Sequence, residues 1–355
     1  MNQTQSFTPD WASPPGATIS DLLEDRGYTL SDFARDIGES VENAEKLIKG
    51  TININNDIAN SLANLFDTSI DFWLSREMQF RESIERLSAN AQWINDFPYG
   101  DMVEYGWIRS ADDINEKIAA CLEFFSVPTV TDWYEKYEGS SKLAAFRTSK
   151  TFTSDEAAVL AWLRKGEIDG TSMRTKNWNR RKFEESLSNI RSLTRKKAPS
   201  KFIPELQKIC AECGVAVIIA RAPSGCRASG ATRFISSNKA LIMLSFRYLS
   251  DDHFWFTFFH EAGHLILHSE TTLFLEGDNL CTGKEEEEAN EFASNILVPQ
   301  EYKEAMKALP VNAKTVMRFA RDIGVSSGII VGQLQHAKIF TQKQLNNLKV
   351  RYQWT

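Results

Sequence analysis

Two histidines and a glutamate between them form the pattern in this chain that is best suited to chemistry. His260 and His264 are four residues apart, and Glu261 follows the first of them. On a helix, residues four apart lie on one face, so the two imidazoles could bind one metal ion from the same side. Glu261 would project about 100° away from His260, where it could hold a metal-bound water instead of the metal. The pattern predicts a hydrolytic zinc site with Glu261 as the catalytic residue.

A catalytic zinc needs a third protein ligand, and a glutamate-rich stretch downstream is the candidate region. As a helix, residues 284–299 would have an apolar face formed by Ala289, Phe292, Ala293 and Ile296. Glu288 and Glu285 lie at the edge of that face. We expect Glu288 to be the third ligand, with Glu285 as the alternative or as an outer neighbour of the site. A glutamate-rich first turn would also be favoured by the helix dipole without any metal.

His268 continues the series of histidines by one more helical turn. A ligand so far along the helix would lean away from a metal held by His260 and His264. We therefore expect His268 to support the site from outside rather than to bind the metal.

The elements that must position these residues are a buried helix and a small sheet before it. Apolar side chains around the histidines predict a buried helix over 254–268. Three short apolar runs upstream predict strands over 215–220, 230–235 and 240–244.

The segment from about 200 to 299 resembles the ImmA/IrrE family of intracellular zinc metallopeptidases. Two blocks in order carry the resemblance, His260 to His268 and Glu288 to Ala293, and the second block continues to Leu297-Val298-Pro299. The resemblance implies zinc bound by two histidines and a glutamate on the following helix. It also implies cleavage of Xre-type repressors, so we expect an endopeptidase whose substrate is a repressor or antitoxin.

Residues 17–80 predict a helix-turn-helix module. A short helix, a turn containing Gly38 and a second short helix ended by Gly50 follow one another. The order Leu-Ser-x-Phe-Ala-x-x-Ile-Gly and the closing Asp-x-Ser-x-x-Phe-Trp-Leu resemble the Xre-type module of HigA-like antitoxins. The positions expected to meet operator DNA or a partner are Ser40, Asn43 and Lys46. Because Glu39, Glu42 and Glu45 lie among them, contact with a protein is the alternative to phosphate binding.

The rest of the chain shows no pattern of catalytic or metal-binding residues, and it indicates only how the domains are arranged. We expect a tail over residues 1–16, a helical connecting region over 81–199, the peptidase over 200–310 and a C-terminal helical segment over 311–355. The expected fold class is α+β and predominantly helical.

Charge is distributed unevenly along the 355 residues, whose formal net charge is −6. Residues 1–80 hold five basic and thirteen acidic side chains, whereas residues 164–201 hold twelve basic and four acidic ones. The two regions could attract each other, or the basic segment could face an acidic partner or nucleic acid. No apolar run is long enough to span a membrane, and no signal peptide is visible, so we expect a cytoplasmic protein.

The alternative function is a DNA-binding antitoxin or repressor of a toxin–antitoxin or stress operon, with a structural or idle metal site. It would have a cognate toxin as partner. A third hypothesis is autoproteolysis that releases the N-terminal module.

Overall fold

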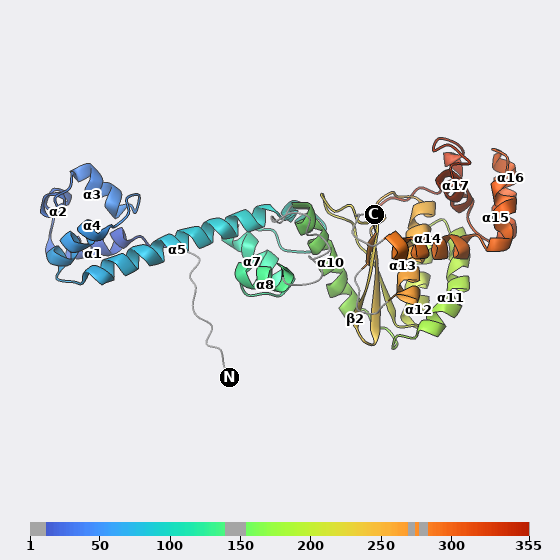
Figure 1. Ribbon diagram of the computed structural model, residues 1–355, viewed down its shortest axis with the longest axis horizontal. Helices are drawn as coiled ribbons and strands as arrows, with labels where there is room; N and C mark the ends of the chain where they lie inside the picture. Colours follow the sequence, from blue (N-terminus) through green and yellow to red (C-terminus); the bar gives the residue numbers. More distant parts are fainter. Residues whose placement is uncertain (1–11, 139–153, 269–273, 277–282, 355) are drawn as a thin grey trace. The chain divides into compact units, whose positions relative to one another are not determined.

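The computed structural model describes four stretches of the chain, residues 12–138, 154–268, 274–276 and 283–354. They pack as two compact units (Figure 1). The first unit comprises the residues up to 95 together with residues 111–119, and the second comprises residues 96–110 and those from 120 onwards.

The first unit is helical and has a core of its own. Its main helices are α1 (Pro15–Arg26), α2 (Leu30–Asp36), α3 (Val41–Ile48), α4 (Asn56–Phe66) and α5 (Ile70–Asn95). The core includes Phe33, Leu62 and Trp73, all fully buried. Between α2 and α3, Gly38 adopts a φ of 74°, which glycine tolerates because it has no Cβ. The sequence-based prediction of a helix-turn-helix module is thereby confirmed.

The second unit is built on a four-stranded sheet. Its strands are β1 (Val215–Ile219), β2 (Gly230–Ser236), β3 (Lys239–Leu244) and β4 (Phe274–Glu276). The spatial order is β1-β3-β2-β4, with β1 parallel to β3, and β2 antiparallel to both β3 and β4. The first three strands were predicted from the sequence, and β4 was not.

Alternation along β1 directs side chains into two separate cores. Val215 and Val217 join the core shared with α11 (Arg180–Ser192), α12 (Pro199–Ala211) and α13 (Asp251–Leu267). Ala216 and Ile218 face α10 (Ser154–Ser172), whose Trp162 Nε1 donates a hydrogen bond of 2.9 Å to the Ala220 carbonyl. Figure 1 shows α10 on one side of the sheet and α13 on the other.

The remaining elements are α6 (Tyr99–Glu104), α7 (Ile114–Phe125), α8 (Val130–Glu138), η1 (Leu193–Arg195), α14 (Gly283–Leu297), α15 (Gln300–Lys307), α16 (Ala313–Ile323), α17 (Ser327–His336) and η2 (Asn346–Leu348). The C-terminal segment is part of the core around α13, since Val316 and Ile329 are buried in the same cluster as that helix. At the start of α13, Asp251 accepts hydrogen bonds from the Ser326 hydroxyl and the Val350 N–H. The boundaries expected at residues 200 and 310 therefore fall inside one packed unit, because α10 and α17 lie beyond them.

The predicted fold class, α+β and mostly helical, is confirmed. No helix in the described part of the chain has the length and apolar character needed to cross a membrane.

Candidate metal centre

Helix α13 holds the two predicted histidine ligands in a fixed position. Nearly every residue from Phe254 to Ile266 is buried, so the helix is surrounded by protein on all sides. Trp255, Phe258 and Phe259 are fully buried and pack against one another. Such a helix has little freedom to rotate or shift, and the imidazoles it carries are held with it.

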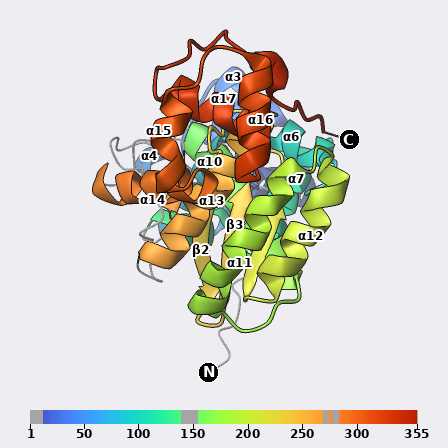
Figure 2. The ribbon, with the colours of Figure 1, turned by 90° about the vertical axis from the view of Figure 1, so that its right-hand side faces the viewer.

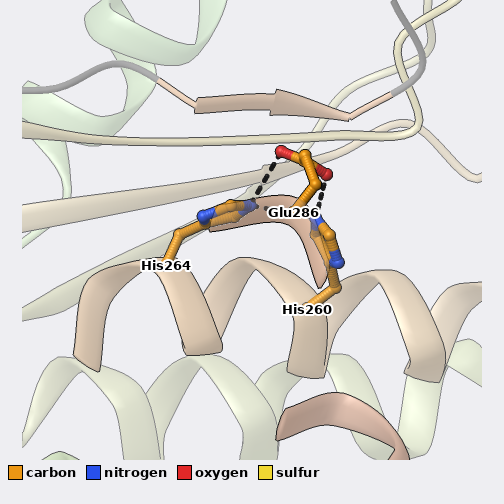
Figure 3. Close-up of side chains that lie close together, drawn as sticks. All are labelled: His260, His264 and Glu286. Atoms are coloured by element: carbon orange, nitrogen blue, oxygen red, sulfur yellow. Dashed lines mark hydrogen bonds and ion pairs between the residues drawn. The ribbon is translucent and has the colours of Figure 1, made fainter. Parts of the chain in front are cut away.

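The side chains of His260 and His264 meet Glu286 of α14 (Figure 3). Their Nε2 atoms are 3.0 Å apart. One carboxylate oxygen of Glu286 lies 3.2 Å from His260 Nε2, and the other lies 3.2 Å from His264 Nε2. We call these three residues the ligand trio. It is the one group of at least three potential metal-binding side chains among the described residues.

The trio fits a catalytic zinc in both chemistry and spacing. Two imidazole nitrogens and one glutamate oxygen are a known donor set for hydrolytic zinc, with the fourth position left for water or substrate. Tetrahedral bonds of about 2.0–2.1 Å require ligand atoms about 3.3 Å apart. The observed separations of 3.0 to 3.2 Å are close to that requirement.

Burial favours the neutral, metal-binding form of the imidazoles. His260 and His264 are 1% and 2% exposed. The pKa of His264 is lowered, mainly by burial, and the neighbouring His260 and His268 act in the same direction while Glu286 opposes them. A histidine with a pKa below its usual value is neutral at pH 7, so its Nε2 lone pair is available to a metal.

The structure brings Glu286 to the histidines, where the sequence led us to expect Glu288 or Glu285. The reason is the rotation of α14 about its axis. Its fully buried positions are Ala289, Ala293 and Leu297. At about 100° per residue, Glu286 lies about 20° from the centre of that face, whereas Glu285 is about 80° and Glu288 about 140° away. The sequence-based face included Phe292 and Ile296, which are only partly buried, and it was therefore rotated towards Glu285 and Glu288 and away from Glu286.

Each histidine of the trio has a further partner at its Nδ1 atom. His260 Nδ1 lies 3.1 Å from Asn290 Oδ1, and His264 Nδ1 lies 2.9 Å from His268 Nδ1. His268 Nε2 is in turn 3.2 Å from Glu288 Oε2. If Nε2 binds metal, Nδ1 carries the hydrogen, so His260 donates to Asn290, and His264 donates to His268.

His268 thus lies outside the trio and contacts one of its members, His264. The sequence had led us to expect that His268 supports the site without binding the metal. Glu288 supports His268 instead of joining the trio. Asn290 was missed in the sequence, although its position four residues after Glu286 places it on the same face of α14.

Glu261 is fully buried and lies against strand β2. A Cβ atom added to Gly230 would come within 2.6 Å of Glu261 Oε1. The Thr232 hydroxyl donates a hydrogen bond of 3.4 Å to the Glu261 carbonyl oxygen. The strand therefore sets the position of both the backbone and the carboxylate of Glu261.

In the first unit, the predicted contact residues Ser40, Asn43 and Lys46 bond to close neighbours in the chain, in α3 or just before it. Ser40 caps α3 by accepting a hydrogen bond from the Asn43 N–H. The Asn43 side-chain amide donates to Glu39 at 2.8 Å, and Lys46 forms an ion pair of 2.6 Å with Glu42. These contacts leave α3 with little uncompensated positive charge for phosphates.

Comparison with family models identifies two domains. Residues 214–334 match a peptidase family model, described as the IrrE N-terminal-like domain. Residues 18–71 match a Cro/C1-type helix-turn-helix DNA-binding domain. No curated protein matches the chain. The first match contains the whole ligand trio and Glu261, and the second contains α2 and α3.

Proposed function

We propose that this chain, which combines an IrrE N-terminal-like peptidase domain with a Cro/C1-type helix-turn-helix domain, is a zinc-dependent endopeptidase acting on a regulatory protein. The observation that carries the proposal is the ligand trio on α13 and α14, with the buried carboxylate of Glu261 adjoining it in the chain.

In this proposal His260, His264 and Glu286 hold the zinc, with Asn290 and His268 orienting the two imidazoles. Bound zinc would supply a Lewis acid that lowers the pKa of water towards about 7 and polarises a peptide carbonyl. Orienting partners of this kind typically change metal affinity or activity by about 10- to 100-fold.

Glu261 would act as the general base. Its carboxylate takes a proton from the attacking water and later passes it to the nitrogen of the leaving amine. The contacts of Glu261 with Gly230 and Thr232 support this role, because a general base must be held within hydrogen-bond reach of the proton it removes.

Substitution of Glu261 by Gln tests the chemistry. The amide keeps the shape of the side chain but cannot accept the proton, so cleavage should fall by about 10²- to 10⁴-fold while the metal content stays at the wild-type level. Persistent cleavage by Glu261→Gln would refute the proposed mechanism.

A matched pair of variants tests the ligand assignment. Glu286→Gln should abolish stoichiometric zinc binding, measured by elemental analysis after dialysis. Glu288→Gln should keep the metal with weaker affinity, because Glu288 contacts His268 and not the trio. The reverse result would restore Glu288 as the third ligand.

The proposed substrate is an Xre-type repressor or an antitoxin in the cytoplasm. The resemblance to ImmA/IrrE peptidases and the fused helix-turn-helix domain support this choice. Purified candidate repressors, incubated with wild-type protein and with Glu261→Gln, should be cut only by the former.

The second candidate is a DNA-binding antitoxin or repressor whose metal is structural, with a cognate toxin as partner. The match of residues 18–71 to a DNA-binding domain favours it. A gel shift with operator DNA and a repression assay distinguish the two: this candidate requires the Glu261→Gln variant to bind and repress normally, with no proteolysis by either protein.

A further inference from the structure

The peptidase-bearing unit has a strongly basic surface that the proposed chemistry does not use. Residues 174–212 contain eleven Lys and Arg but only four Glu. They form α11, η1 and α12, and the two helices lie side by side (Figure 2). We call the surface formed by the exposed Lys and Arg side chains of residues 174–212 the basic face.

Six cations of the basic face are exposed and form no ion pair with any described residue. They are Arg174, Lys176, Arg180, Arg195, Lys197 and Lys201. The segment has only four glutamates to neutralise its cations. Three of them already form ion pairs with cations outside these six: Glu185 with Arg181, Glu205 with Lys196, and Glu212 with Lys182. The positive charge of the face is therefore largely uncompensated.

The six cations fall into two groups at opposite ends of α11. One group lies near its first residue, Arg180, and the other begins just after its last turn, at Arg195. Because α11 has 13 residues, the groups are separated by about 20 Å. The major groove of DNA is about 12 Å wide, so a stripe of this length can reach the phosphates on both sides of it.

The basic face lacks the side chains that anchor protein partners. All of residues 174–212 are described, and none of the exposed large hydrophobic side chains is among them. Protein interfaces depend on buried aromatic and apolar anchors, whereas phosphate contacts need only cations and polar groups. The ring of Trp178 is partly buried and packs against Phe183 and Phe234, so protein already covers part of its surface.

We propose that the basic face binds the phosphate backbone of double-stranded DNA without reading its sequence. This contact complements α3, whose Lys46 and Lys49 are paired with Glu42 and Glu45. DNA binding by the face is independent of the peptidase chemistry. Only its consequence, which is to hold the peptidase near DNA-bound regulators, rests on the proposed function.

The salt dependence of binding gives the expected size of the effect. Six phosphate contacts predict a slope of about −5 for log K against log salt concentration, or a loss of about a thousandfold between about 50 and 200 mM salt. Removal of three contacts should reduce the slope to about −2.7 and the loss to about forty-fold.

The test uses the full-length protein and short duplexes of several unrelated sequences, with binding followed by fluorescence anisotropy. The variant replaces Arg195, Lys197 and Lys201 by Gln. The control replaces Lys314, Arg318 and Lys343 by Gln; these are also exposed cations without an ion pair among described residues, and they lie on or after α16. Both proteins lose the same total charge, so only position distinguishes them.

The proposal expects the variant to have the reduced slope on every duplex and the control to behave as wild type. Equal weakening of both proteins would overturn it, since net charge alone would then explain binding. A wild-type slope in the variant would also overturn it. If that variant had in addition lost substrate cleavage, the basic face would instead be the binding site of an acidic protein partner. Glu261→Gln should bind DNA as wild type does, so failure of the peptidase proposal would be seen separately.

Discussion

A single methyl group at Gly230 should disable the site without touching any proposed ligand. Gly230 is the first residue of β2, and a Cβ at this position would lie 2.6 Å from Glu261 Oε1, 2.7 Å from Thr257 Cγ2 and 2.8 Å from Glu261 Cγ. The backbone of Gly230 is not in the left-handed region, so alanine is conformationally allowed there. The effect of Gly230→Ala is therefore steric, and it displaces the side chain of Glu261, the proposed general base.

The size of the displacement follows from these distances. Ordinary van der Waals contact begins at 3.4 Å, so the carboxylate must retreat by roughly 0.8 Å from the added methyl group. A misplacement of about 1 Å typically costs about 10²-fold in rate, which corresponds to about 2.7 kcal/mol of transition-state stabilisation. Crowding a buried position should also reduce the free energy of unfolding by about 1–3 kcal/mol.

The assay compares kcat/KM for a cleaved repressor, zinc content and unfolding by urea in wild type, Gly230→Ala and Gly100→Ala. A Cβ at Gly100 meets nothing within 4 Å, so this control should match wild type in all three. Gly230→Ala should retain its zinc and lose about 10²-fold in kcat/KM. Full activity in Gly230→Ala would refute the position assigned to Glu261, and loss of zinc would refute its separation from the ligands.

Three further predictions follow from other contacts. Asn290→Ala removes the partner of His260 Nδ1 and should weaken zinc binding by about 10- to 100-fold, measured by competition with a chromophoric chelator. Burial raises the pKa of Asp251 from 3.8 to about 6, so the folded state binds this proton more tightly than the unfolded chain does, and stability falls as the pH rises from about 4 to about 6. Asp251→Asn can still accept from the Val350 N–H, and urea unfolding should find it up to about 3 kcal/mol more stable than wild type above about pH 6, with no advantage below about pH 4. Trp73→Ala should destabilise the first unit by about 3–5 kcal/mol in thermal unfolding and leave the zinc content unchanged, since Trp73 is fully buried in a core without metal ligands.

The sequence was most informative where a local pattern determines local structure. Helix α13 was predicted from its two histidines and the apolar residues around them, and it extends only a few residues beyond the expected start. Strands β1 to β3 and the module around Gly38 were predicted from short apolar runs and turn residues. Each of these signals involves neighbours in the chain, so none required knowledge of the tertiary contacts.

The domain boundaries were less predictable because they depend on contacts between distant residues. The sequence of helix α10 does not show one clear apolar face. Its packing against the sheet becomes evident only in the structure, where Trp162 donates a hydrogen bond to the Ala220 carbonyl. Similarly, α17 belongs to the peptidase-bearing unit because Gly328 and Gly332 allow it to approach Asp251 and Asp252 at the start of α13. Periodicity indicates that a helix has a buried side, but it does not identify the element that buries it.

The choice among consecutive glutamates shows the same limit at the site itself. Residues 285 to 288 have identical side chains, so only the rotation of α14 can distinguish them. That rotation is fixed where Gly263 lies close to α14: a Cβ on Gly263 would be 3.3 Å from Ala289 Cα and 3.1 Å from Phe292 Cδ1. With Ala289 held against α13, the carboxylate three residues earlier is directed at the histidines, and Glu288 turns towards His268. The glutamate that meets the two histidines is thus selected by a glycine on the opposite helix, because the close approach at Gly263 sets which carboxylate can reach them.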